Sequence, residues 1–64
     1  MIRTTEHTNG TIHHGNGFTV FADNQNGEND IRVYGWLGTW EDHDSAQHID
    51  FDTVEDAIFV FTGN

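Results

Sequence analysis

Apolar and polar residues alternate along several short stretches of the chain, which is the pattern of strands with one buried face. Residues 31–37 give the clearest run, with Ile, Val, Gly and Leu on one side and Arg, Tyr and Trp on the other. Residues 18–22 form a second run with Phe21 on its second side. In residues 48–52 the two apolar side chains should point inward, and His48 and both Asp outward. The aromatic residues on the second side predict a sheet with one buried face and one partly apolar face.

A polar hairpin is predicted to precede these strands. Residues 2–8 and 11–14 flank the Asn-Gly pair at positions 9–10, which favours a type I′ turn because both central positions need a positive φ. A two-residue turn at this pair places His7 opposite Ile12. Further turn signals follow at residues 15–17 and 24–29.

An apolar stripe with helical spacing occupies the last part of the chain. Its members recur at i, i+3, i+4 and i+7, namely Val54, Ala57, Ile58 and Phe61. Asp52 or Thr53 is the predicted N-cap, with Glu55 or Asp56 completing a capping box. Gly63 suits the position just after a helix. The alternative for this element is a strand, because the stripe lies within a continuous β-prone run.

These elements predict an α+β fold: a small antiparallel β-meander of three to five strands with one C-terminal helix packed on one face. The 64 residues are expected to form a single small domain, residues 1–64. The chain has no Cys and no Pro, so no disulfide or thiolate metal site can stabilise it. Enclosed active-site clefts usually need about 300–1,000 Å³. A domain this short has little room for one, which predicts a protein that is not an enzyme.

Charge narrows the choice of partner. The chain has eleven acidic residues, two Arg and no Lys, which gives a formal net charge of −9. Nucleic acids and anionic membranes are excluded as direct partners, because contacts to phosphate groups need Lys and Arg. A basic protein surface is the complementary partner. Adaptation to high salt, or acidity that serves solubility alone, is the alternative. The chain lacks an apolar run of about 18 residues and a signal-peptide core, so we expect a cytoplasmic protein.

The acidic residues concentrate in one stretch, residues 41–56, which contains no Lys or Arg. Seven carboxylates lie there: Glu41, Asp42, Asp44, Asp50, Asp52, Glu55 and Asp56. Residues two apart on a strand lie about 6.6 Å apart on one side, so Asp50 and Asp52 imitate the spacing of phosphates along nucleic acid. Three aromatic residues are candidate anchors for the same partner, since Trp and Tyr are frequent binding hot spots: Trp36, Trp40 and Tyr34. Packing in a core is the alternative for these aromatics.

The sequence gives little support for a metal site or for a catalytic group. The five His lie among carboxylates and make a small metal-binding module an alternative function, but their spacing matches no established ligand pattern, so no metal or cofactor is assigned. Surface His that buffer the neighbouring acids near pH 6 are the simpler interpretation. Ser45, His48 and Asp50 are close in sequence, but a loop and a strand need not bring their side chains together.

The protein resembles phage-encoded inhibitors of host defence, above all anti-CRISPR proteins, some of which are DNA mimics. The resemblance rests on its small size, the absence of Lys and the acidic run of residues 41–56. The resemblance implies a non-enzymatic inhibitor that binds the basic nucleic-acid-binding surface of a host complex and blocks DNA recognition. A CRISPR effector is the leading partner that it implies, with the host cytoplasm as the compartment. These proteins share no common motif, so the resemblance transfers no functional residue.

Overall fold

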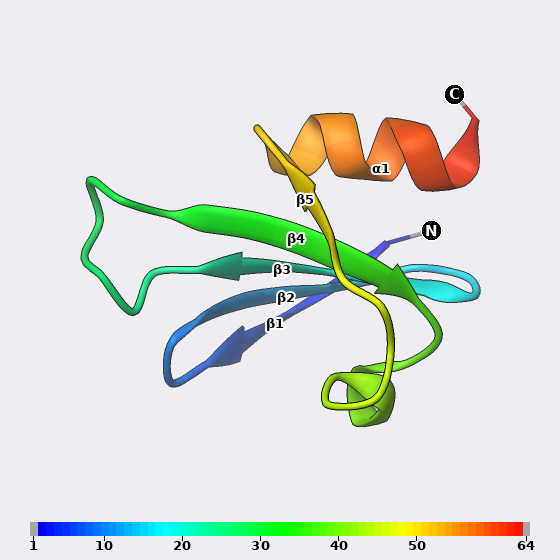
Figure 1. Cartoon of the computed structure of the whole chain (residues 1–64), viewed down its shortest axis with the longest axis horizontal. Coiled ribbons are helices and arrows are strands. Elements are labelled where there is room, and N and C mark those ends of the chain that lie inside the picture. Colours follow the sequence, from blue (N-terminus) through cyan, green and yellow to red (C-terminus); the bar gives the residue numbers. More distant parts are fainter. Residues whose placement is uncertain (1, 64) are drawn as a thin grey trace.

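A five-stranded antiparallel sheet carries one helix on one face (Figure 1). This computed structural model describes residues 2–63. The elements are β1 (Arg3–His7), β2 (Gly10–His14), β3 (Phe18–Asp23), β4 (Arg32–Leu37), the 3₁₀ helix η1 (Trp40–Asp42), β5 (Ile49–Phe51) and α1 (Val54–Thr62). The strand order in the sheet is the order in the chain. The predicted α+β meander with one C-terminal helix is therefore confirmed.

The first hairpin differs from the prediction in its register. We expected His7 opposite Ile12, but His7 pairs with Gly10, because residues 8–9 make the turn and Gly10 lies in β2. Gly10 is needed for close packing, since a Cβ there would collide with the carbonyl group of Ala22 in β3. The shift of two residues leaves each side chain on its predicted face, so His7 and Ile12 still share a face.

The last element is the predicted helix, and the strand alternative is wrong. Thr53 is the N-cap, and its hydroxyl accepts a hydrogen bond of 3.0 Å from the backbone N–H of Asp56. Gly63 follows the helix in the left-handed conformation, with φ 78°. The predicted stripe faces the sheet and joins a core made by Phe18, Val20, Val33 and Ala57 with Ile2, Ala22, Phe51, Val54, Ile58 and Phe61. Phe59 and Val60 lie off the stripe and are exposed.

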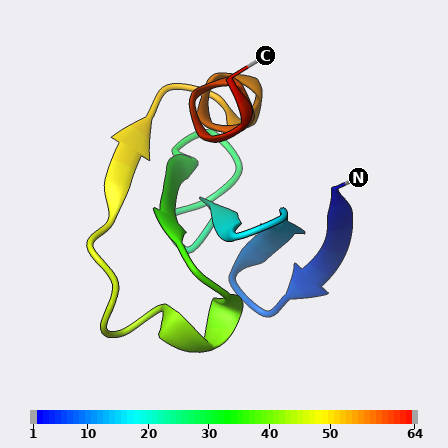
Figure 2. The same ribbon diagram turned by 90° about the vertical axis from the view of Figure 1, so that its right-hand side faces the viewer.

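The opposite face of the sheet has its own core. Ile12, Phe21, Tyr34 and Trp36 form it, with Trp40 and Ala46 packed against them. Residues 39–47 cover this face, because Trp40 and Ala46 pack on its core. Figure 2 places α1 and η1 at opposite ends of the view, with the strands between them. The sheet is therefore buried on both faces at its centre, although only one fully buried face was predicted.

Candidate functional site

The seven predicted carboxylates lie between η1 and the first turn of α1, in the segment that contains β5, the last strand of the sheet. Figure 2 places η1 and α1 at opposite ends of the view, so these carboxylates extend past β5 from one face of the sheet to the other. All seven residues are exposed: Glu41, Asp42, Asp44, Asp50, Asp52, Glu55 and Asp56. We call this set the acidic edge. Within residues 2–63, Arg32 is the one arginine in ion-pair contact with it.

Two members of the acidic edge bind groups of the protein itself. Asp42 Oδ2 accepts hydrogen bonds from the backbone N–H of Thr39 at 2.9 Å and from its hydroxyl at 3.3 Å, which fixes the start of η1. Asp50 Oδ1 accepts from Arg32 Nη2 at 2.9 Å and from Nε at 3.1 Å. The guanidinium carbon of Arg32 also lies 4.5 Å from the centre of the Tyr34 ring. These two carboxylates therefore have structural partners.

The remaining members carry their charge with fewer internal contacts. Asp44 is fully exposed, and its Oδ1 accepts a hydrogen bond of 3.1 Å from His43 Nδ1. Glu55 and Asp56 lie in the first turn of α1, where the helix dipole favours negative charge. Asp52 lies between β5 and α1. The acidic edge thus presents several carboxylates to solvent on both sides of β5.

Two of the three expected anchors are not available to a partner. Trp36 is fully buried and Tyr34 nearly so, because β4 directs both toward the core under residues 39–47. The expectation that they contact a partner is therefore wrong, and the alternative of core packing holds for both. Trp40 is half-buried and packs on Phe21 and Trp36, with ring centres 5.1 and 5.8 Å apart.

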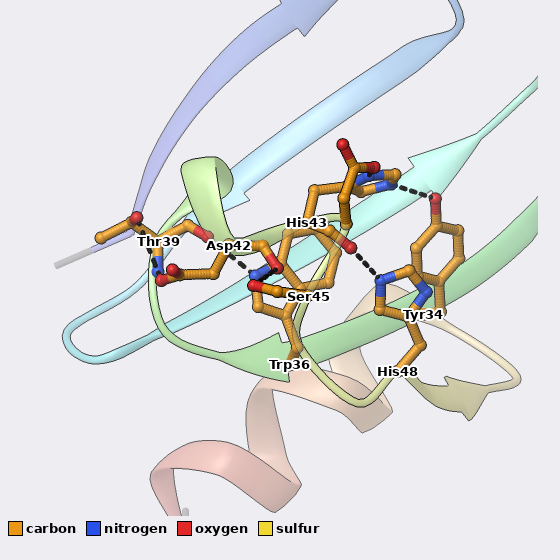
Figure 3. A network of polar contacts seen from close by, with 8 residues as sticks. Tyr34, Trp36, Thr39, Asp42, His43, Ser45 and His48 are labelled. Atoms are coloured by element: carbon orange, nitrogen blue, oxygen red, sulfur yellow. Dashed lines mark hydrogen bonds and ion pairs between the residues drawn. The ribbon is translucent and has the colours of Figure 1, made fainter.

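Hydrogen bonds of two histidines and Trp36 hold residues 39–47 against this aromatic core (Figure 3). Trp36 Nε1 donates to the carbonyl oxygen of Thr39 at 2.8 Å. Nε2 of His43 and the hydroxyl of Tyr34 share a hydrogen bond of 3.0 Å. His48 Nε2 donates to the carbonyl oxygen of His43 at 2.7 Å, and its ring stacks on Tyr34 with centres 4.7 Å apart. We expected His48 to point outward, and the structure places it in this layer instead.

The residues considered for a catalytic group or a metal site do not come together in the structure. Ser45 Oγ donates to a backbone carbonyl at 3.4 Å, His48 also bonds a backbone carbonyl, and Asp50 pairs with Arg32. These three side chains therefore make no catalytic chain of hydrogen bonds. Within residues 2–63, no group of three or more His, Cys, Asp or Glu could hold a metal ion. The histidine-based metal module is thus without a site in this part of the chain.

Burial shifts the titration of three side chains. It lowers the pKa of His13, with the neighbouring His14 acting in the same direction and Glu6 opposing. Burial also lowers the pKa of His14, and Arg3 adds to the effect. These two imidazoles therefore stay neutral to a lower pH than an unperturbed His side chain does. Burial, followed by the charge of Asp23, raises the pKa of Tyr34, while Arg32 acts against this shift.

One surface hollow has a volume of about 400 Å³, and none of its lining residues belongs to β5. Its lining comes from the first three strands, the turn after β2, the segment that leads into η1 and η1 itself: Arg3, His14, Gly15, Gly17, Thr19, Gly38, Thr39, Trp40 and Glu41. The hydroxyl of Thr19 donates to the carbonyl oxygen of Gly38 at 2.9 Å, so it is already engaged. The lining contains no paired carboxylates and no Ser or Cys nucleophile.

An apolar feature next to β5 was missed from the sequence. Leu37 is 73% exposed and Ile49 is 44% exposed, although both lie on the face of the sheet that was predicted to be buried. With Ala46 and Gln47 they line a hollow of about 310 Å³, which we call the β5 hollow. α1 runs roughly along the strands (Figure 1). A helix with its side chains is about 10–12 Å wide, whereas five strands span roughly 19 Å. A single helix therefore leaves part of the sheet uncovered, and that comparison was open to sequence reasoning.

Comparisons with known proteins gave no relative from which a role could be read. No protein-family model, curated protein or solved structure matches the chain. No helix within residues 2–63 is long and apolar enough to cross a membrane. The acidic edge and the β5 hollow are therefore the features of the molecule that bear on its function.

Proposed function

We propose that this protein is a non-enzymatic inhibitor that binds a basic nucleic-acid-binding surface of a host defence complex and blocks DNA recognition there. A CRISPR effector in the host cytoplasm is the leading partner. The observation that carries the proposal is the acidic edge, with seven exposed carboxylates between η1 and the first turn of α1 and a single arginine contact within residues 2–63. Such a surface is complementary to the Lys and Arg that hold nucleic acid.

The chemistry of recognition follows from charge and geometry. Arg guanidinium groups bind carboxylates through two parallel hydrogen bonds, much as they bind phosphates. Asp44 and Asp52 flank β5 in sequence, are exposed, and have no Arg within ion-pair distance among residues 2–63. In a CRISPR effector, the matching cations line the heteroduplex channel or read the PAM. An inhibitor of this type occupies these cations and needs no catalytic group.

A second candidate is an acidic accessory domain whose charge serves solubility or adaptation to salt. The observation in its favour is that some of the carboxylates have structural uses. Asp42 fixes the start of η1, and Glu55 and Asp56 occupy the first turn of α1. These uses need no partner, and the dependence of stability on salt separates the two candidates.

The experiment measures DNA binding by a panel of purified CRISPR effector–guide complexes with and without this protein. The double variant Asp44→Lys/Asp52→Lys reverses two carboxylates that make no contact with Arg32. We expect the wild type to weaken DNA binding by at least one effector. The double variant should lose about tenfold or more of its affinity for that effector, the equivalent of about 1.4 kcal/mol.

The matched control is Glu6→Lys/Glu28→Lys, which changes the net charge equally but lies on β1 and in the loop after β3. It should inhibit nearly as well as the wild type. Equal losses in both variants would mean that only net charge matters and that the acidic edge is not the interface. If no effector in the panel is inhibited, the leading partner is wrong.

A further inference from the structure

Besides charge, β5 offers a partner the unpaired backbone of an edge strand. It is the last strand of the sheet, and within residues 2–63 it pairs with β4 alone. The other side of its backbone is therefore open to a further strand. Edge strands bind extended segments through main-chain hydrogen bonds, while alternate side chains of the segment fill pockets on the two faces of the sheet.

The two faces of the sheet differ in chemistry at β5. Leu37 and Ile49 lie on the side that carries α1, where they line the β5 hollow. Asp50 points to the other face, where it binds Arg32. Side chains alternate along a strand, so an added strand would place every second residue beside the hollow and the residues between them beside Asp50. This arrangement fits a segment in which apolar and basic residues alternate.

Charge decides between the candidate occupants. A second copy of this chain would bring two acidic edges together, and each copy carries a net charge of −9. A basic segment instead meets Asp44 before β5 and Asp52 after it. The carboxylates thus disfavour self-association through β5 and favour a cationic strand.

We propose that an extended, Arg-containing segment of a protein partner pairs with β5 as a sixth strand and places an apolar side chain in the β5 hollow. The inference rests on the proposed function and defines how the partner is held. The apolar contact adds affinity that charge alone does not supply, because Leu37 and Ile49 lose solvent exposure only when the hollow is filled.

Two blocked synthetic peptides test the inference by NMR titration of the ¹⁵N-labelled protein. One is acetyl-Gly-Arg-Leu-Arg-Leu-Arg-Gly-amide, and the other has Ser in place of both Leu. We expect the Leu peptide to bind about tenfold more tightly than the Ser peptide. Its amide shift changes should centre on residues 49–51 and Leu37, and the β5 amides should exchange more slowly with solvent.

Leu37→Ser should remove the preference for the Leu peptide while leaving the Ser peptide unaffected. Ile31→Ser is the matched control, because Ile31 is 50% exposed and precedes β4, whereas Leu37 is the last residue of β4. The control should keep the preference. Circular dichroism of both variants verifies that they remain folded.

Equal binding of the two peptides would overturn the inference but leave a charge-based proposed function intact. If neither peptide binds at millimolar concentration, the inference fails together with the attraction to basic segments. Sedimentation that shows a dimer weakened by Leu37→Ser would identify a second copy as the occupant and would also overturn it. If the effector panel shows no inhibition but the Leu peptide binds as expected, only the leading partner is wrong.

Discussion

Gly35 determines how closely α1 packs on the sheet. It lies in the middle of β4, and a Cβ placed there would approach Phe61 Cε2 and the carbonyl oxygen of Thr19, each at 2.8 Å. The ring of Phe61 can shift, but the backbone of β3 cannot do so without distorting the sheet. Gly35 is therefore a position where two backbones and a side chain of α1 approach closely.

Gly35→Ala should therefore lower the free energy of unfolding by about 1–3 kcal/mol, the usual cost of overpacking a core. Urea unfolding monitored by tryptophan fluorescence measures it. Val60→Ser is the control, because Val60 is exposed on α1 and its change should stay within about 0.5 kcal/mol. A Gly35→Ala protein as stable as the wild type would mean that α1 does not pack closely at this position.

Single residues also show where sequence reasoning stopped. The two sides of residues 31–37 were predicted correctly, because a period of two fixes which residues share a face. The sequence placed His48 on the correct side but in solvent, whereas its imidazole lies in an aromatic layer where a carbonyl accepts its N–H. Residues 39–47 have no periodic pattern that would reveal that they cover a core. The sequence therefore left open whether Trp36 is buried or contacts a partner.

At the scale of elements, α1 is nine residues long, and helices this short depend on packing and capping. The hydroxyl of Thr53 satisfies the backbone N–H of Asp56, and removal of an N-cap typically costs about 1 kcal/mol. The sequence located this helix because its cap, stripe and terminal Gly agree. It did not locate the turn of the first hairpin, where packing of Gly10 against β3 overrides the preference of Asn-Gly.

Thr53→Ala should therefore destabilise the protein by about 1 kcal/mol. Thr62→Ala is the matched control, because its hydroxyl only donates back to the carbonyl oxygen of Ile58 at 2.7 Å. That change should be neutral or slightly stabilising, since Ala has the higher helix propensity. Thermal unfolding of the two variants measures the difference, and equal losses in both would rule out Thr53 as the cap that stabilises α1.

At the scale of the whole molecule, a net charge of −9 is confined to a body of 29 × 23 × 21 Å. The Debye length at physiological ionic strength is about 8 Å, so salt screens most of the repulsion across the molecule. What salt cannot supply is the apolar packing of the two cores, which holds the sheet at its centre. We therefore expect a fold that does not depend on concentrated salt.

We expect the protein to be folded at about 0.15 M NaCl, with a melting temperature that rises modestly from low salt and then levels off. Melting curves by circular dichroism across a salt series measure this. A protein that is unfolded at about 0.15 M and folds only near 1 M NaCl would favour the accessory domain adapted to salt.

The order of the strands has a consequence for how the chain reaches its structure. Each strand pairs with the strand next to it in sequence, so few long loops have to close before pairing begins. Pairing can propagate from one hairpin to the next, and α1 can dock on the ladder that is already formed. Because such local pairing is fast, a newly made chain exposes its unpaired strand edges to other chains only briefly.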